Sequence, residues 1–193
     1  ELTHTRRVVE QYARQRVEYE SKSEAPPLPT HFELGFGEAG MEHPDFELTL
    51  GAEVARLKGR IDRIDVVETG PIPGFRVIDY KSGHAPSKKD VDDGRMLQLP
   101  LYAMAIERLV YQNGGGTLLD VGYWGLKDKG FKPIVLEHWA DFREDLIERV
   151  FAIIRRLQGG TFPVAPHKDG CEAYCEYRSV CRIRQVRNAA KVI

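Results

Sequence analysis

The sequence predicts an α/β fold. Segments with apolar residues at helical spacing occur near both ends and in the middle of the chain, and segments of alternating polar and apolar residues lie between them. Stretches rich in Gly and Pro separate the two kinds of segment, as is typical of turns. At 193 residues the chain has the length of one domain with its own core. We therefore expect a single domain over 1–193, in which 161–193 form a basic tail that contains the cysteines.

The first twenty residues predict an amphipathic helix. Their apolar side chains recur at helical spacing among many charged ones, at Val8, Val9, Tyr12 and Val17. The pattern stops before the proline-bearing stretch Ser23–Pro29, which predicts a loop.

Alternation with period two predicts antiparallel strands in the next part of the chain. The alternating segments cover residues 31–36, 46–50 and 54–68. The turn formers of Gly70–Gly74 then precede Phe75–Lys81, which is rich in strand-forming residues. We expect the strands on either side of this turn to form a hairpin.

The second half of the chain predicts a helix, two strands and a final helix. After a polar segment, 82–94, these elements cover residues 96–111, 118–126, 131–137 and 141–157. Pro100 either kinks the first of these helices or occupies its first turn. Gly159 and Gly160 supply the stop signal for the last helix.

Charge and hydropathy exclude two classes of protein. A formal net charge of -1 argues against a uniformly basic coat for nucleic acid, so any DNA contact must come from local patches. The clearest basic patch is the tail, through Arg178, Arg182, Arg184, Arg187 and Lys191. No apolar run approaches the ~20 residues that cross a bilayer, and the chain begins at Glu1 without a methionine. We expect a cytoplasmic fragment of a longer protein, with no membrane partner.

Two acids and a lysine form the group with the most specific chemistry. Asp79 and Lys81 leave the same face of the predicted strand, and a hairpin closing near Gly70–Gly74 would bring Asp62 close to them. Carboxylates that hold Mg²⁺ supply the Lewis acid and the activated water that phosphodiester hydrolysis needs, and Lys81 could position that water. The simpler interpretation is an exposed hairpin on which Asp62, Asp65 and Asp79 are solvated and Lys81 pairs with a neighbouring acid.

Three motifs together resemble the PD-(D/E)xK nucleases of the RecB and AddB type. They are Gly59-x-x-Asp62, the run Val77–Gly83, and Gln98-Leu99-Pro100-Leu101-Tyr102, within a resemblance that covers about Thr30 to Cys181. The resemblance implies a restriction-endonuclease-like core, in which a mixed sheet is flanked by helices. It also implies a Mg²⁺- or Mn²⁺-dependent deoxyribonuclease that acts in DNA repair and recombination.

The resemblance also assigns expected roles. Asp62 and Asp79 would bind the metal, the backbone carbonyl of Tyr80 would be a further ligand, and Lys81 would be the catalytic lysine. Gln98 and Tyr102 match a Gln-x-x-x-Tyr helix motif, and one helical turn between them lets both face the same groove. By strand alternation Arg60 shares a face with Asp62, where it would hold a phosphate or pair with that aspartate. Glu33 lies where related nucleases often carry an acid, but it equally fits a surface strand.

The chain departs from the family pattern at its metal ligands. Many relatives carry an active-site histidine on an N-terminal helix, and neither His4 nor His31 lies in a matching motif. Without it one metal position would be weakened, so we expect this fragment to bind metal loosely and to cleave slowly or not at all.

The cysteines Cys171, Cys175 and Cys181 resemble the C-terminal part of an iron-sulfur staple. The sequence has no fourth cysteine, and the first gap holds three residues rather than the expected two. A complete [4Fe-4S] cluster is therefore expected, if anywhere, in the parent protein. A zinc site completed by His167 and three reduced cysteines without metal are the alternatives.

Three functions remain open. The first is DNA hydrolysis, on single strands fed to the site by a helicase domain or subunit. The second is an inactive DNA-binding or scaffolding module of a repair complex, and the intact set of Asp62, Asp79 and Lys81 argues against it. The third is a CRISPR-associated nuclease of the same family.

Overall fold

The computed structural model describes residues 2–22, 25–68, 70–83, 85–127, 130–161, 173, 175–179 and 181. The chain divides into two compact units, residues 1–151 and 152–193. In the described part of the chain, no helix is long and apolar enough to span a membrane.

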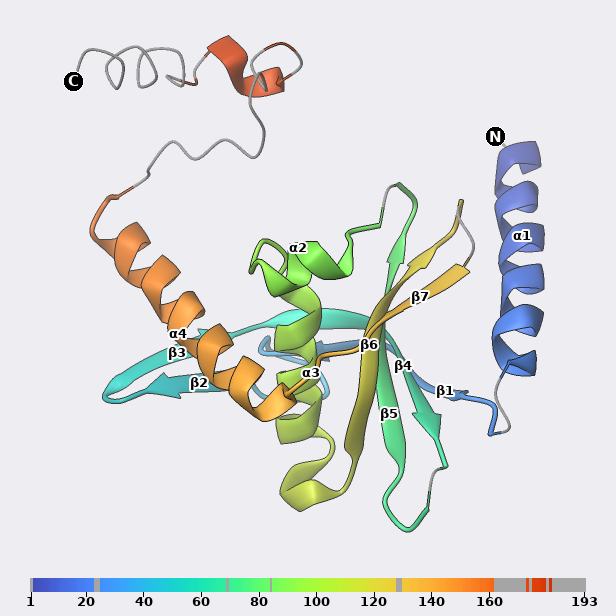
Figure 1. The fold of residues 1–193 in the computed structure, drawn as a ribbon, viewed down its shortest axis with the longest axis horizontal. Helices are drawn as coiled ribbons and strands as arrows, with labels where there is room; N and C mark the ends of the chain where they lie inside the picture. The colour runs from blue at the N-terminus through green and yellow to red at the C-terminus, as the bar shows by residue number, and fades with distance from the viewer. Residues whose placement is uncertain are drawn as a thin grey trace. The chain divides into compact units, whose positions relative to one another are not determined.

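A five-stranded mixed sheet forms the centre of the first unit (Figure 1). Its strands, in spatial order, are β1 (Leu28–Phe36), β4 (Gly59–Val67), β5 (Gly74–Lys81), β6 (Thr117–Gly125) and β7 (Gly130–Ile134). The β5–β6 pair is parallel, and the other neighbouring pairs are antiparallel. The expected α/β fold with a mixed sheet is confirmed.

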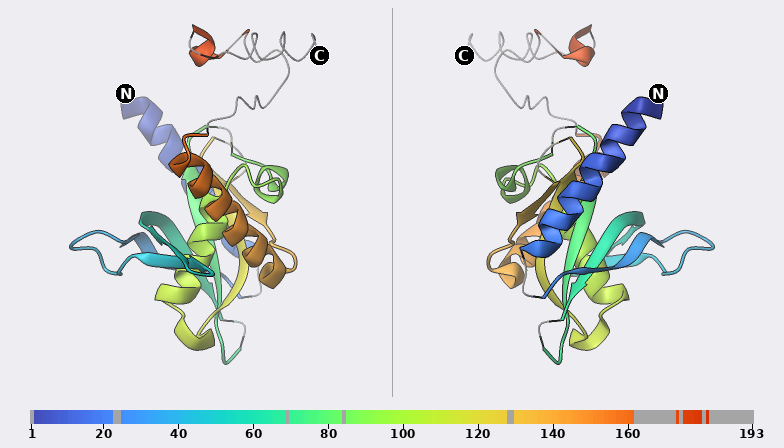
Figure 2. Two further views of the ribbon diagram at one scale, coloured as in Figure 1. Left: turned by 90° about the vertical axis from the view of Figure 1, so that its left-hand side faces the viewer. Right: turned by 90° about the vertical axis from the view of Figure 1, so that its right-hand side faces the viewer.

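Helices cover both faces of this sheet. Helix α1 (Leu2–Ser21) lies against one face, and α3 (Gln98–Leu109) lies against the other (Figure 2). The link from β5 to β6 contains the short helix α2 (Lys88–Asp92), then α3 and the 3-10 turn η1 (Gln112–Gly114), and a crossover of this kind is what a parallel pair requires. Pro100 occupies the first turn of α3, where its missing N–H has no cost.

Helix α4 (Trp139–Gln158) starts in the first unit. The Trp139 indole and the Arg143 guanidinium both donate to the Glu107 carboxylate of α3, each at 2.9 Å. These bonds, together with the buried Leu146 and Phe151, attach the N-terminal part of α4 to the α3 side of the sheet.

A two-stranded hairpin stands apart from the main sheet. Strands β2 (Phe46–Leu50) and β3 (Glu53–Leu57) pair with each other and form a separate sheet. The alternating segment 54–68 is therefore two strands divided at Lys58. Only its second part, β4, enters the main sheet, where it pairs with β1 and β5.

The core has apolar side chains on both faces of the sheet. The side chains with no exposed surface include Ile61, Ile64, Val77, Ile78, Leu99 and Ile106. The polar pair Arg63 and Asp65 is equally buried. In the second unit, α4 ends before Gly159, and the 3-10 turn η3 (Glu176–Ser179) is followed by Cys181, whose N–H donates to the Tyr177 carbonyl.

Candidate active site

The β4–β5 hairpin brings Asp62 and Asp79 together. Arg63 pairs with Ile78, and the same antiparallel register continued by one residue places Asp62 opposite Asp79. At this point the ladder ends, and the Tyr80 N–H donates instead to Oδ2 of Asp62 at 2.8 Å. The turn formers at Gly70–Gly74 thus set the register that the sequence predicts.

Asp79 and Lys81 form an ion pair at the end of β5. Asp79 is 3% exposed, and the Lys81 Nζ lies 2.5 Å from its Oδ2. Apart from this ion pair, Asp79 Oδ2 has no hydrogen-bond partner among the described residues. Burial raises the pKa of the Asp79 carboxyl, the Lys81 ammonium opposes the rise, and the negative charge of Asp62 adds to it.

Tyr80 points to the opposite face, as strand alternation predicts. Its hydroxyl lies 3.0 Å from the Tyr12 hydroxyl of α1 and accepts a hydrogen bond from Arg63 at 3.2 Å. Burial raises the pKa of Tyr80 to about 12, against the effect of the Arg63 charge. The backbone between Asp79 and Lys81 is therefore held in place from the α1 face.

Arg63 is itself fixed by Asp65. The guanidinium makes two bonds to the Asp65 carboxylate, at 2.5 and 2.6 Å, and both side chains are fully buried. Burial works against the charged guanidinium, but its bonds to Asp65 and Tyr80 raise the pKa of Arg63. The simpler interpretation, in which the acids of this hairpin are solvated, is wrong for Asp65 and Asp79.

Arg60 does not pair with Asp62. It is exposed, and its Nη1 lies 3.7 Å from Oε2 of Glu33. In the β1–β4 register Glu33 falls opposite Asp62, between the Phe32–Arg63 and Leu34–Ile61 pairs, and its φ of 51° is in the left-handed region. Strict alternation of the two strands is therefore broken beside Asp62, at a backbone conformation that is uncommon for glutamate.

Gln98 and Tyr102 lie together on α3. The Gln98 amide donates to the Tyr102 hydroxyl at 3.4 Å, so both side chains face the same side of the helix. The Tyr102 ring makes an edge contact with Phe36. Both rings come within 3.0 Å of the position that a Cβ on Gly59 would take, so they pack directly on this glycine. The motif thus packs against the start of β4, three residues before Asp62.

The donor set fits a divalent cation. Two converging carboxylates and a neighbouring backbone carbonyl are the hard oxygen ligands that such ions prefer, and the buried Asp79 Oδ2 has no partner but the Lys81 ammonium among the described residues. Among the described residues no group of three or more acids, histidines or cysteines gathers around one point. The side chains alone supply a pair of ligands.

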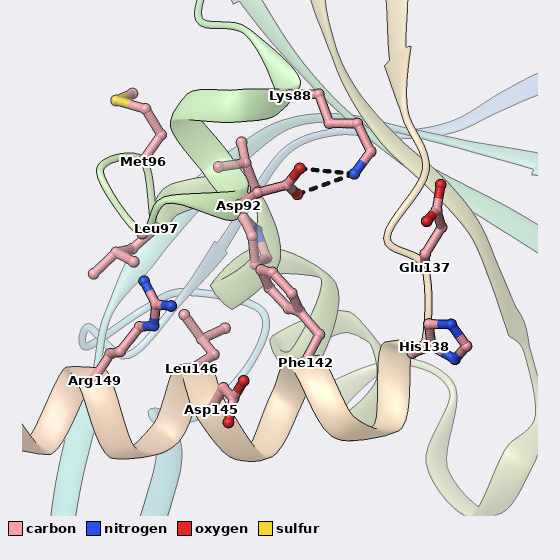
Figure 3. Close-up of a pocket in the computed structure, with 13 residues that line it drawn as sticks. Lys88, Asp92, Met96, Leu97, Glu137, His138, Phe142, Asp145, Leu146 and Arg149 are labelled. Carbon is pink, nitrogen blue, oxygen red and sulfur yellow. Dashed lines mark hydrogen bonds and ion pairs between the residues drawn. The ribbon is translucent and has the colours of Figure 1, made fainter.

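A cavity of about 260 Å³ lies between α2, the start of α3 and the first half of α4 (Figure 3). Apolar side chains such as Leu97 and Phe142 line it, together with the Lys88–Asp92 ion pair and Arg149. Asp62, Asp79 and Lys81 are not among its lining residues. The cavity is therefore a separate feature from the acidic pair.

Most of the predicted tail residues fall outside the described part of the chain. These are Cys171, His167, Arg182 and Arg184, and the side chain of Arg178 as well. Cys175 and Cys181 are described, and both are free, half-buried thiols. The iron-sulfur, zinc and metal-free alternatives stay predictions.

Two residues of the site were missed by the sequence reasoning. Arg63 follows Asp62 directly, and its spacing from Asp65 puts both on one face of β4, which could have indicated the pair. Tyr123 lies beside Asp79 on β6 within the apolar run Val121–Trp124, whose composition indicates only core.

Comparison with known proteins agrees with this geometry. A family profile described as "PD-(D/E)XK nuclease superfamily" matches residues 2–182. The chain is also similar to the B subunits of ATP-dependent helicase/deoxyribonucleases from several bacteria. Identity is 44% over 80 residues in Thermoanaerobacter sp. (strain X514), 42% over 112 in Clostridium kluyveri (strain NBRC 12016) and 35% over 137 in Clostridium botulinum (strain Loch Maree / Type A3).

These matches take in 41%, 56% and 67% of this chain, but only 7%, 9% and 11% of the relatives. The chain thus corresponds to a small part of each relative. The family profile, in contrast, spans nearly the whole chain, and the mixed sheet with helices on both faces agrees with it. The chain belongs to the PD-(D/E)XK nuclease superfamily.

Proposed function

We propose that this chain is the nuclease domain of a helicase-nuclease and hydrolyses phosphodiester bonds in DNA. One observation carries the proposal: the ends of β4 and β5 bring Asp62 and Asp79 together, with the Lys81 ammonium 2.5 Å from Asp79. Membership of the superfamily and the similarity to helicase/deoxyribonuclease B subunits support it.

Asp62 and Asp79 are the side-chain ligands in this proposal, and the carbonyl of Tyr80 is the third. A Mg²⁺ or Mn²⁺ ion held there would supply a Lewis acid and an activated water at neutral pH. Lys81 sits where it can orient that water or offset charge on the phosphate. The hydrogen bond from the Tyr80 N–H keeps Asp62 turned toward β5.

The other predicted residues would act on the DNA strand. Gln98 and Tyr102 present an amide and a hydroxyl from α3, near the start of β4. Arg60 is exposed, and its ion pair with Glu33 is a long 3.7 Å contact, so its guanidinium can turn to a phosphate. The substrate we propose is single-stranded DNA, delivered by a helicase domain or subunit as the names of the relatives suggest.

The test is cleavage of a labelled single-stranded oligonucleotide with Mg²⁺, with Mn²⁺ and with EDTA. We expect slow metal-dependent cleavage by the wild-type chain, and a loss of at least about 100-fold in Asp79→Asn and in Asp62→Asn, because each removes a metal ligand. Lys81→Met should lose a similar factor while still binding DNA.

Asp141→Asn is the matched control, since it removes one acid charge from the exposed first turn of α4. It should cleave like the wild type. Cleavage that survives Asp79→Asn would refute the proposed site. DNA binding that is sensitive to salt, unchanged in all four variants and without cleavage in Mn²⁺, would instead identify a scaffolding module.

A further inference from the structure

Tyr123 is a fully buried tyrosine beside the acidic pair. It lies on β6, which runs parallel to β5, and the register places it next to Asp79. Neighbouring residues in register share a face of the sheet, so Tyr123 leaves the same face as Asp79 and Lys81. Trp124, the next residue, faces α1 with Tyr80.

The ring of Tyr123 contacts the lysine. Lys81 Nζ lies 5.5 Å from the ring centroid, within the range at which the π-face attracts a cation. Lys81 is thus held by two groups: the Asp79 carboxylate at 2.5 Å and the face of this ring. If a metal ion drew the carboxylate away, the ring contact would still hold the ammonium.

The hydroxyl of Tyr123 has no partner among the described residues. It is buried from solvent, and a buried phenol normally finds a hydrogen bond. A tyrosine phenol keeps its proton at neutral pH, so this hydroxyl is a donor.

The acids whose charges reach this hydroxyl are Asp79 of β5, its neighbour in register, and Asp90 of α2. Both are already paired: Asp79 with Lys81, and Asp90 with the N-cap residue Ser87 and, at 3.7 Å, with Arg95. The Tyr123 hydroxyl is thus a buried donor left for a small polar guest.

We infer that Tyr123 is a positioning residue of this site, whose ring holds the Lys81 ammonium and whose hydroxyl donates to an oxygen bound beside Asp79. That oxygen belongs to a water molecule or to the phosphate of the DNA strand. The inference rests on the proposed function, because it takes the acidic pair to be where the phosphodiester binds.

The first measurement separates ring from hydroxyl. Tyr123→Phe keeps the ring, and we expect kcat to fall about 10- to 100-fold with little change in KM, as when one donor to a reacting oxygen is removed. Tyr123→Leu also removes the ring face, and should lose about 3- to 30-fold more. Tyr111→Phe is the control: Tyr111 stacks on Phe75 with ring centroids 4.8 Å apart, and its variant should cleave like the wild type.

The second measurement does not depend on cleavage. In the chain labelled with 3-fluorotyrosine, the ¹⁹F resonance that disappears in Tyr123→Phe belongs to Tyr123. It should shift on addition of Mg²⁺ alone if the guest is water, or only on addition of Ca²⁺ with a short single-stranded oligonucleotide if the guest is a phosphate oxygen. The Tyr111 resonance should stay in place, and Asp79→Asn should abolish the shift.

The outcomes distinguish this inference from the proposed function. A Tyr123 resonance that responds in a chain without cleavage supports the inference and counts against catalysis by this chain. A wild type that cleaves, together with Tyr123→Phe at full kcat and an unmoved resonance, overturns the inference and leaves the proposed function standing. A Tyr123→Leu variant that loses stability but not kcat also overturns it, since that is the behaviour of a core side chain.

Discussion

Asp120 is a buried acid on the α1 face of the sheet. It is 6% exposed and pairs with the Arg76 guanidinium at 3.0 Å, while its other carboxylate oxygen has no hydrogen bond in the described part of the chain. Burial raises the pKa of Asp120 to about 6, against the effect of Arg76, and the charge of Asp65 adds to the rise. Ionisation of Asp120 at neutral pH therefore lowers the free energy of unfolding.

A pKa raised on folding means that the native state binds the proton more tightly than the unfolded state. The free energy of unfolding should therefore fall as the pH rises from about 4 to about 6, and stay level above that range. Asp120→Asn removes the ionised form and keeps an acceptor for Arg76. We expect it to stabilise the protein at pH 7.5 by an amount on the order of 1–3 kcal/mol, and to lose that advantage near pH 4.

Urea unfolding at the two pH values measures this difference. Glu68→Gln serves as the matched control, because Glu68 is an exposed acid at the end of β4. It should show no comparable gain at pH 7.5. A stabilisation by Asp120→Asn that is equal at pH 4 and pH 7.5 would contradict the titration account.

Helix α1 is joined to the sheet mainly through polar side chains rather than through an apolar stripe. Gln15 accepts from the Trp124 indole at 2.7 Å and donates to the Gly125 carbonyl, and Tyr19 donates to Asp65. Tyr12 accepts from Arg63. The same guanidinium therefore connects α1 to Tyr80, whose backbone carries Asp79 and Lys81 on either side.

Removing Arg63 should be costly. In Arg63→Met the buried Asp65 carboxylate loses its ion pair and keeps only the hydrogen bond from the Tyr19 hydroxyl among the contacts described above. We therefore expect a loss of about 3–5 kcal/mol in the free energy of unfolding. The double variant Arg63→Met with Asp65→Asn should lose less than Arg63→Met alone, since the uncompensated charge is gone. Equilibrium unfolding in urea measures this for Arg63→Met, for Asp65→Asn and for the double variant.

Arg56→Met provides the comparison at an exposed ion pair, where Arg56 meets Glu47 at 3.0 Å, and it should change the stability little. A double variant that loses as much as the sum of the two single variants would show that the buried charges act independently.

The strands and long helices could be predicted from the sequence because their patterns are local. The helical spacing of Leu146 and Val150, which are buried, and the strand-forming composition of β5 can both be seen without reference to the rest of the chain. Helix α2 lacks such a stripe, since only Val91 of its five residues is buried. Its local signal is the capping box of Ser87 and Asp90, and a five-residue helix is too short to show a helical period.

The pairing of the strands could be predicted only where a turn sets it. The Gly70–Gly74 turn fixes the register of Asp62 against Asp79, so this half of the site followed from the sequence. The pairing of β1 with β4, across the intervening β2–β3 hairpin, and the parallel pairing of β5 with β6 are non-local. Tyr123 reaches the site through the second of these, which explains why its neighbours in sequence gave no sign of it.

At the scale of the whole chain, the first unit holds its own core. Every buried apolar side chain in the described ranges lies between Pro27 and Phe151. The acidic pair, Lys81, Tyr123 and the Gln98–Tyr102 motif lie in the same unit. The sheet and the candidate site therefore require no side chain from beyond residue 151 among those described.

We accordingly expect residues 1–160 to fold by themselves. This truncation keeps all of α4, including the buried Leu146, Val150 and Phe151, and ends at the Gly159–Gly160 stop. It removes the three cysteines and the basic tail, so it also tests what they contribute.

The truncated chain should unfold cooperatively in urea, and the slope of its free energy of unfolding against urea concentration should be reduced only in proportion to its length. It should keep any metal-dependent cleavage, while its affinity for DNA should depend less on salt. Truncation after residue 138 is the contrasting case, because it removes α4, whose Phe142, Leu146 and Ile147 lie beside the buried Pro100 and Met104 of α3. If residues 1–160 failed to unfold cooperatively and iron or zinc were found in the full chain, a metal-bound tail would be part of the fold.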